Sequence, residues 1–236
     1  MGLAFLQNGD GSGAIAEFRT AVRLRPDDSG YKGNLGAAYL QVADFDTAIS
    51  EFEEALKLSP QDATLHYNLG LALKLKDKLP EAVTELRKAT EFDPGQADAH
   101  YTLGVTLWQQ GNFAGAAEEL RAAIHAKPDY AEAYYTLGTV LKQKRELPEA
   151  VTALREAIRL QPEFAGPHTT LATVLRQLGD TEGAAAESRA GMEIAKQKTS
   201  EQAALFATNS GRRLLNAGDL EGAISQFRAA INSSPD

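Results

Sequence analysis

Residues 29–62 read SGYKGNLGAAYLQVADFDTAISEFEEALKLSPQD, and this stretch decides the fold because its pattern recurs along the chain. Prolines recur at one constant step, at Pro26, Pro60, Pro94, Pro128 and Pro162. The same step aligns four Leu-Gly pairs, which begin at Leu35, Leu69, Leu103 and Leu137. A period of this length is typical of arrays of small repeated units.

Each unit has the composition of a helical hairpin. Two apolar-periodic stretches of about a dozen residues are separated by breaker or capping residues such as Gly9-Asp10 and Gly111-Asn112. Pro80 suits the first turn of a second helix, where its missing N–H costs nothing. A small residue at Gly36 lets two helices approach, and a large one at Phe52 fills the gap between hairpins. Because no unit buries its apolar face alone, we expect neighbouring units to stack.

These rows resemble the tetratricopeptide repeat (TPR) family, whose pattern combines Leu-Gly, a bulky residue, a small Ala, a Phe and a terminal Pro in repeats of about 34 residues. Unit 29–62 matches best, through Leu35, Gly36, Tyr39, Ala48, Phe52, Ala55 and Pro60. The resemblance implies an all-α fold, a right-handed α-solenoid of antiparallel helix pairs with about seven repeats. We divide the chain into a partial repeat 1–28, repeats 29–62, 63–96, 97–130 and 131–164, a degenerate repeat 165–198, an insert 199–203 and a last repeat 204–236.

The pattern weakens after residue 165, where Ser188 replaces the large apolar residue and Lys196 replaces proline, so the second helix is expected to run on. The step from Pro162 to Pro235 is five positions longer than two periods, which places an insert at 199–203. Thr199, with Gln202 three positions later, predicts an N-cap and a new, lengthened first helix. We expect the pitch of the superhelix to change there.

Composition excludes several classes of function. A formal net charge of -8 disfavours nucleic acid as a partner. The chain has no cysteine, which removes disulfides and thiolate metal sites. No signal-peptide pattern or membrane-spanning window is visible, so we expect no membrane insertion. No phosphate loop or catalytic motif occurs, and we expect neither enzymatic activity nor a cofactor.

Three histidines share the fourth position of their units: His66, His100 and His168. We interpret them as packing residues, in the slot that Tyr134 occupies in unit 131–164. Helices about 8–10 Å apart cannot bring such a row within about 2 Å of one metal ion. We therefore predict no metal site.

The resemblance implies that positions 2, 5, 6, 9, 12 and 13 of each unit line a concave groove. Position 6 holds amides and hydroxyls: Asn34, Asn68, Thr102, Thr136, Thr170 and Asn209. Position 13 holds amides at Gln41, Gln109, Gln143 and Gln177. Aromatic residues add Tyr67, Tyr101 and Tyr135 at position 5 and Trp108 at position 12. These rows predict a binding groove for an extended peptide or partner protein, similar to the asparagine-ladder members of the family.

Three alternatives stay open. The polar and aromatic rows can instead satisfy neighbouring helices. The first unit would begin before Met1 and the last lacks a polar cap, so the chain is either a piece of a longer array or a structural protomer that self-associates end to end through its terminal repeats. The array can also be the docking arm of a larger enzyme. The basic two-carboxylate clamp of the chaperone-binding members is not matched, since its positions hold residues such as Tyr67, Asp98 and Glu132.

Overall fold

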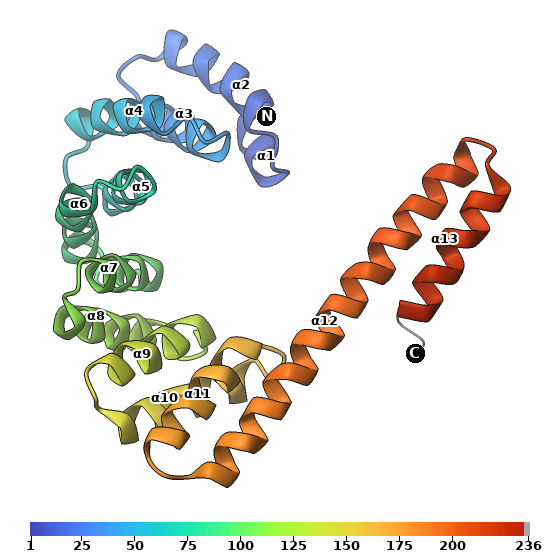
Figure 1. Cartoon of the computed structure of the whole chain (residues 1–236). Helices are drawn as coiled ribbons and strands as arrows, with labels where there is room; N and C mark the ends of the chain where they lie inside the picture. The colour runs from blue at the N-terminus through green and yellow to red at the C-terminus, as the bar shows by residue number, and fades with distance from the viewer. Residues whose placement is uncertain (234–236) are drawn as a thin grey trace. The chain divides into compact units, whose positions relative to one another are not determined.

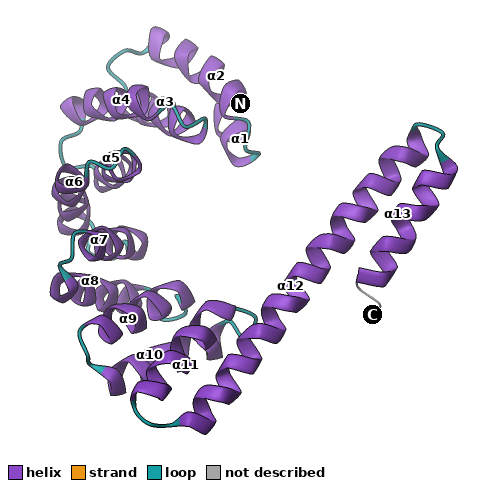
Figure 2. Ribbon diagram, in the orientation of Figure 1, coloured by secondary structure: helices purple, strands orange, loops and turns teal. Residues whose placement is uncertain are grey.

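A computed structural model describes residues 1–233 of the chain, so Pro235 of the predicted repeat pattern lies outside the described residues. The described residues form thirteen α-helices. Figure 2 shows helices joined by loops and no strand among the described residues. The chain divides into two compact units, unit 1 at 1–146 and unit 2 from residue 147 onward. The predicted all-helical TPR-type solenoid is confirmed.

Unit 1 consists of four helix pairs and a ninth helix, α9, which follow one another along the chain, as can be traced in Figure 1. Its helices are α1 (Gly2–Gln7), α2 (Gly11–Leu24), α3 (Ser29–Gln41), α4 (Phe45–Leu58), α5 (Ala63–Leu75), α6 (Leu79–Phe92), α7 (Ala97–Gln109), α8 (Phe113–Ala126) and α9 (Ala131–Gln143). The first helices α3, α5 and α7 each pack on the second helix of their own pair and on that of the pair before it. The same helix–helix contacts are thus repeated at the interval of the sequence repeat.

Unit 2 contains α10 (Leu147–Leu160), α11 (Ala165–Gln177), α12 (Thr181–Asn216) and α13 (Leu220–Ser233). Helix α11 packs against α10 and α12, and α13 folds back along α12. No helix within residues 1–233 is both long and apolar enough to cross a membrane.

The glycine and phenylalanine rows explain the close packing within each pair. A Cβ atom added at Gly36 would lie 2.7 Å from the Phe52 ring, and one added at Gly70 would lie 2.6 Å from Leu86. Phe52 and Leu86 are fully buried, as are Ala48 and Ala55. The predicted close approach of two helices at the glycine row is confirmed, and Pro80 lies in the first turn of α6 as predicted.

The turn between the two helices of a pair has one fixed geometry. One residue in each of these turns has a positive φ: Gly9, Gly111, Gly179 and Gly218, and also Ala43, Asp77 and Arg145. An Asp or Asn at the N-cap follows in several pairs, as where Asp44 accepts a hydrogen bond from the Thr47 N–H. Glycine adopts this left-handed conformation without strain, whereas the three other residues do so at a cost.

Helix α12 corrects one prediction. It runs without a break for 36 residues, so Thr199 is not an N-cap and no new first helix begins there. The Thr199 hydroxyl instead donates to the Ala195 carbonyl at 2.9 Å, a bond made inside a helix. The segment 195–203 reads AKQKTSEQA, with no proline or glycine, and most of its residues favour helix. The predicted running-on of the second helix is confirmed, and it continues into the next unit.

Candidate functional site

The predicted groove residues of unit 1 lie on α3, α5, α7 and α9, and contacts join α3 to α5, α5 to α7 and α7 to α9. Side chains at the same position of successive units are therefore about one helix spacing apart, or about 8–10 Å. Thr170, Gln177 and Asn209 belong to unit 2, where Thr170 is half-buried and the other two are exposed.

The sixth-position row divides into two kinds of side chain. Asn34 and Asn68 are half-buried, and no hydrogen bond joins either side chain to any of the described residues. Thr102 and Thr136 are buried, and the Thr136 hydroxyl donates to the Glu132 carbonyl of its own helix at 2.8 Å. Only the two asparagines thus present free amides at this position among the described residues of unit 1.

Two of the predicted glutamines connect neighbouring repeats within unit 1. The Gln41 amide donates to the Leu6 carbonyl at 3.0 Å, and the Trp108 indole N–H donates to the Gln143 side-chain oxygen at 2.9 Å. In both cases position 12 of one unit bonds to position 13 of the next. Gln109 is exposed and makes no hydrogen bond among residues 1–233. Part of the position-13 row is therefore structural.

The position-5 tyrosines are half-buried, in line with the packing alternative. Burial raises the pKa of the Tyr67 hydroxyl, and hydrogen bonding by Thr102 opposes that rise. The Tyr101 ring lies 5.0 Å from the Tyr130 ring, measured between centroids. The Tyr130 hydroxyl donates to Asp98 Oδ1 at 2.9 Å, and burial together with this carboxylate raises the Tyr130 pKa. Tyr67 is thus held by burial and by Thr102, and Tyr101 packs on the Tyr130 ring.

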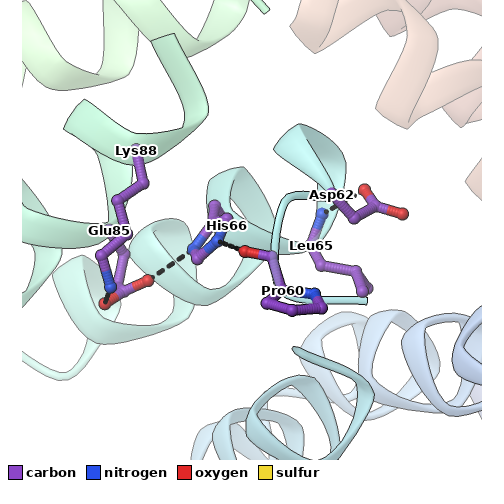
Figure 3. A network of polar contacts seen from close by, with 6 residues as sticks. All are labelled: Pro60, Asp62, Leu65, His66, Glu85 and Lys88. Carbon is purple, nitrogen blue, oxygen red and sulfur yellow. Dashed lines mark hydrogen bonds and ion pairs between the residues drawn. The ribbon is translucent and has the colours of Figure 1, made fainter. Parts of the chain in front are cut away.

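The histidines do more than pack. The His66 ring is buried, 5.4 Å from the Phe92 ring, and its two nitrogens face two acceptors, as Figure 3 shows. Nδ1 lies 2.6 Å from Glu85 Oε2 and Nε2 lies 2.9 Å from the Pro60 carbonyl oxygen. Lys88 holds the other Glu85 oxygen at 2.8 Å. His66 thus joins its own first helix to the second helix and to the preceding turn.

The same bridge recurs in two other units. Nδ1 of His100 lies 2.7 Å from Glu119, and Nδ1 of His168 lies 2.6 Å from Glu187. Their Nε2 atoms face the carbonyls of Pro94 and Pro162 at 3.2 and 3.4 Å. The His100 ring lies between two acceptors, and this arrangement favours the form in which both of its nitrogens carry protons. Hydrogen bonding to Glu119 accordingly raises the pKa of His100.

The sequence contained a signal for these bridges that the packing interpretation missed. A glutamate follows each histidine at the same interval, as Glu85 follows His66, whereas Tyr134 is followed at that interval by Ala153. The histidines do not converge, and among the described residues no group of three His, Asp or Glu side chains could hold a metal ion.

Comparison with known families agrees with the geometry. Models described as tetratricopeptide repeat match residues 1–42, 101–165 and 135–191, and models described as TPR repeat match 44–77 and 72–111. No curated protein matches the chain.

Several solved structures share the fold. A MamA chain from Desulfovibrio magneticus RS-1 that runs from position 41 to the end is 25% identical with a TM-score of 0.66, over 71% of this chain and 94% of that chain. YrrB, described as a TPR protein with an unusual peptide-binding site, is 21% identical with a TM-score of 0.68, over 75% of this chain and 91% of YrrB. The C-terminal part of a TPR repeat-containing protein from Cytophaga hutchinsonii is 16% identical with a TM-score of 0.71, over 99% of this chain and 94% of that one.

Family models thus cover more than half of the chain, and the residues they match contain helices α1 to α11 of the structure. The chain belongs to the tetratricopeptide repeat family.

Proposed function

We propose that this chain is a non-catalytic interaction scaffold that holds an extended peptide along α3 and α5 of unit 1. TPR proteins generally act as scaffolds for protein interactions. The observation that carries the proposal is the pair of half-buried amides at Asn34 and Asn68, which bond to none of the described residues. Water reaches these polar atoms, since neither side chain is among the buried groups without a partner, and a ligand that supplies both a donor and an acceptor can replace that water.

The spacing of the two amides fits a peptide backbone. Adjacent first helices lie about 8–10 Å apart, and an extended chain rises about 3.3 Å per residue. Asn34 and Asn68 would therefore contact two peptide residues that are about three positions apart in a peptide that crosses the helices. An amide can donate to a backbone carbonyl and accept from a backbone N–H at once, so such contacts read the backbone rather than the side chains.

The tyrosines complete the surface. Tyr67 neighbours Asn68 on α5 and Tyr101 follows on α7, and both are held in place by burial or ring contact. Fixed aromatic side chains offer contact area at low cost in conformational entropy, as at interaction hot spots. Gln109 extends the polar surface. Gln143 holds the Trp108 indole by a hydrogen bond, and the Thr136 hydroxyl bonds to the backbone of its own helix. We expect a surface of this kind to accept many peptide sequences.

The proposal can be tested with peptides selected against the whole chain from a random library. Affinity is measured by fluorescence anisotropy. Asn34→Ala combined with Asn68→Ala should weaken binding at least about tenfold, since hydrogen bonds each contribute about 1 kcal/mol. The thermal melting temperature should stay unchanged. Gln110→Ala, an exposed amide at position 14, is the matched control and should bind as the wild type does. Unchanged affinity of the double variant would refute this site.

A second candidate function is that of a structural protomer that assembles end to end. Ile224 and Ile231 of α13 are 52% and 65% exposed. Their counterparts in α4, Ile49 and Leu56, pack against the core beside α5. Sedimentation velocity over a wide concentration range tests this function. Assemblies that keep growing with concentration, and that Ile224→Asp abolishes, would favour it over the peptide scaffold.

A further inference from the structure

Helix α12 joins two helices that are separate in every other described unit. Residues 181–194 of α12 correspond to the second helices, and residues 204–216 correspond to the first helices. Elsewhere a turn with a proline and an N-cap residue separates them, such as Pro60 and Asp62, where Asp62 accepts from the Leu65 N–H. Lys196 and Lys198 stand at those two positions in α12. Neither a proline nor a cap therefore ends the helix.

One consequence is an uncovered first-helix face. The third residue of a first helix is buried at Leu65, Ala99, Ala133 and Pro167. The corresponding residue of the last unit is Phe206, which is 76% exposed. A large aromatic side chain at this position is thus left in solvent, because the C-terminal half of α12 does not turn back onto its N-terminal half.

The matching second-helix face is uncovered as well. Met192 corresponds to Leu56 of α4, which packs in one core cluster with Leu65 of α5. Met192 is 68% exposed. Thr169 of α11, which occupies position 5, is exposed whereas Gly33 and Tyr67 at the same position are buried and half-buried. The faces of Met192 and Phe206 are therefore the two halves of an interface that regular units form within one chain.

These two halves cannot meet within one chain while α12 is intact. The segment from Met192 to Phe206 spans about 21 Å along the helix, and the two side chains point within about 40° of one another. Thr199 lies midway between them on the same face, and Gln197 lies on the opposite face of the helix.

We infer that two copies of this chain pair antiparallel along α12, with the Phe206 face of each copy covering the Met192 face of the other. A two-fold axis then passes near Thr199, and the contact is closed and isologous rather than an open end-to-end contact. It reproduces between two copies the antiparallel packing of α4 on α5, because a second helix and the following first helix run in opposite directions.

The charge pattern of α12 is compatible with this pairing. With Met192 opposite Phe206, Ala195 faces Ala203, and these two small residues allow close approach. Lys196 faces Gln202 and Lys198 faces Ser200. None of the charged residues of α12 stands directly opposite another charge in this register.

The test uses engineered cysteines, since the natural chain has none. Thr199→Cys should form a disulfide-linked dimer on mild oxidation, because the two copies of residue 199 face one another across the axis. Gln197→Cys is the matched control on the opposite face and should not cross-link. In sedimentation, the wild type should be a dimer, and Phe206→Asp should weaken it by at least about a hundredfold, because each dimer loses two buried rings.

Leu215→Asp changes an exposed leucine on the side of α12 opposite Phe206 and should leave the dimer intact. A wild type that stays monomeric at the highest soluble concentration would overturn the pairing. So would equal cross-linking of Gln197→Cys, or a dimer that Phe206→Asp leaves unchanged. An intrachain disulfide in monomeric Met192→Cys, Phe206→Cys would also overturn it, because the hairpin would then close onto its own chain. None of these results bears on the peptide site at Asn34 and Asn68, which lies in unit 1.

Discussion

Gly36→Ala tests whether helix spacing in the array is set by the glycine row. The new Cβ would lie 2.7 Å from one Phe52 ring carbon and 2.8 Å from the next, and the ring is fully buried. Overpacking of this kind costs about 1–3 kcal/mol. An alanine in mid-helix gains only about 0.5–1 kcal/mol over glycine. We expect a net loss of about 1–2 kcal/mol in the free energy of unfolding.

The same reasoning predicts coupling between the two positions. Phe52→Ala alone should cost about 3–5 kcal/mol, because it leaves a cavity in the core. In the double variant the added methyl no longer meets a ring, so Gly36→Ala should become neutral or favourable. The coupling energy should therefore be about 1–3 kcal/mol. Unit 165–198 carries such a compensated pair naturally, with Ala172 at the glycine position and Ser188 at the phenylalanine position.

Urea unfolding followed by circular dichroism measures all four members of the cycle. Midpoint and slope are compared together, because repeat arrays can lose cooperativity when one unit is weakened. Gly30→Ala is the control, since Gly30 lies on α3 at an exposed site that only the Asp28 side chain approaches. It should be neutral or slightly stabilising. Additive losses in the double variant, or a stabilising Gly36→Ala, would refute the spacing argument.

Three further predictions concern turns, caps and pH. Ala43→Gly should raise the melting temperature by the equivalent of about 0.5–1 kcal/mol, because Ala43 has a φ of 61 in the left-handed region. Gln96→Asp should add about 0.5–2 kcal/mol in urea unfolding, since Gln96 makes no side-chain cap bond, its buried Oε1 has no partner, and Asp62 caps α5 at the same position. Hydrogen bonding to Glu119 raises the pKa of His100 above its usual value of 6.5. The contribution of this bridge to the free energy of unfolding should therefore be fully present below pH 6.5 and lost as the pH rises through the folded-state pKa. Urea unfolding at several pH values measures this dependence, which Glu119→Gln should lack.

Much of the fold can be predicted from the sequence because similar residue types recur at the packing positions of successive repeats. A glycine in the first apolar stretch of a unit and a large apolar residue in the second, as in Gly36 and Phe52, predict two helices in close contact, and the structure shows that contact. Residue types alone could not show which polar side chains are free. Thr136 and Asn34 share a position, but the threonine hydroxyl reaches the carbonyl of Glu132 in its own helix, whereas the asparagine has no bond among the described residues.

The continuity of α12 shows where sequence signals compete. A Thr199 cap is worth about 1 kcal/mol, and that local gain favours a helix start. Breaking a helix there would also forfeit the backbone hydrogen bonds of residues 195–203, most of which have high helix propensity. The break in regular units is stabilised by tertiary packing of residues such as Leu65, which the local signal at Thr199 does not include. A partner copy that covers Phe206 would supply that packing without breaking the helix.

The two hydrogen bonds between units clarify what the groove rows do. Leu6 with Gln41 and Trp108 with Gln143 are both separated by one position more than the sequence period. Successive first helices are therefore offset so that position 13 of one unit reaches position 12 of the unit before it. A glutamine can span that offset, whereas the shorter Asn34 and Asn68, which lie closer to the middle of their helices, make no such bond. Gln41 and Gln143 thus connect neighbouring repeats, whereas Asn34, Asn68 and Gln109 make no hydrogen bond among the described residues.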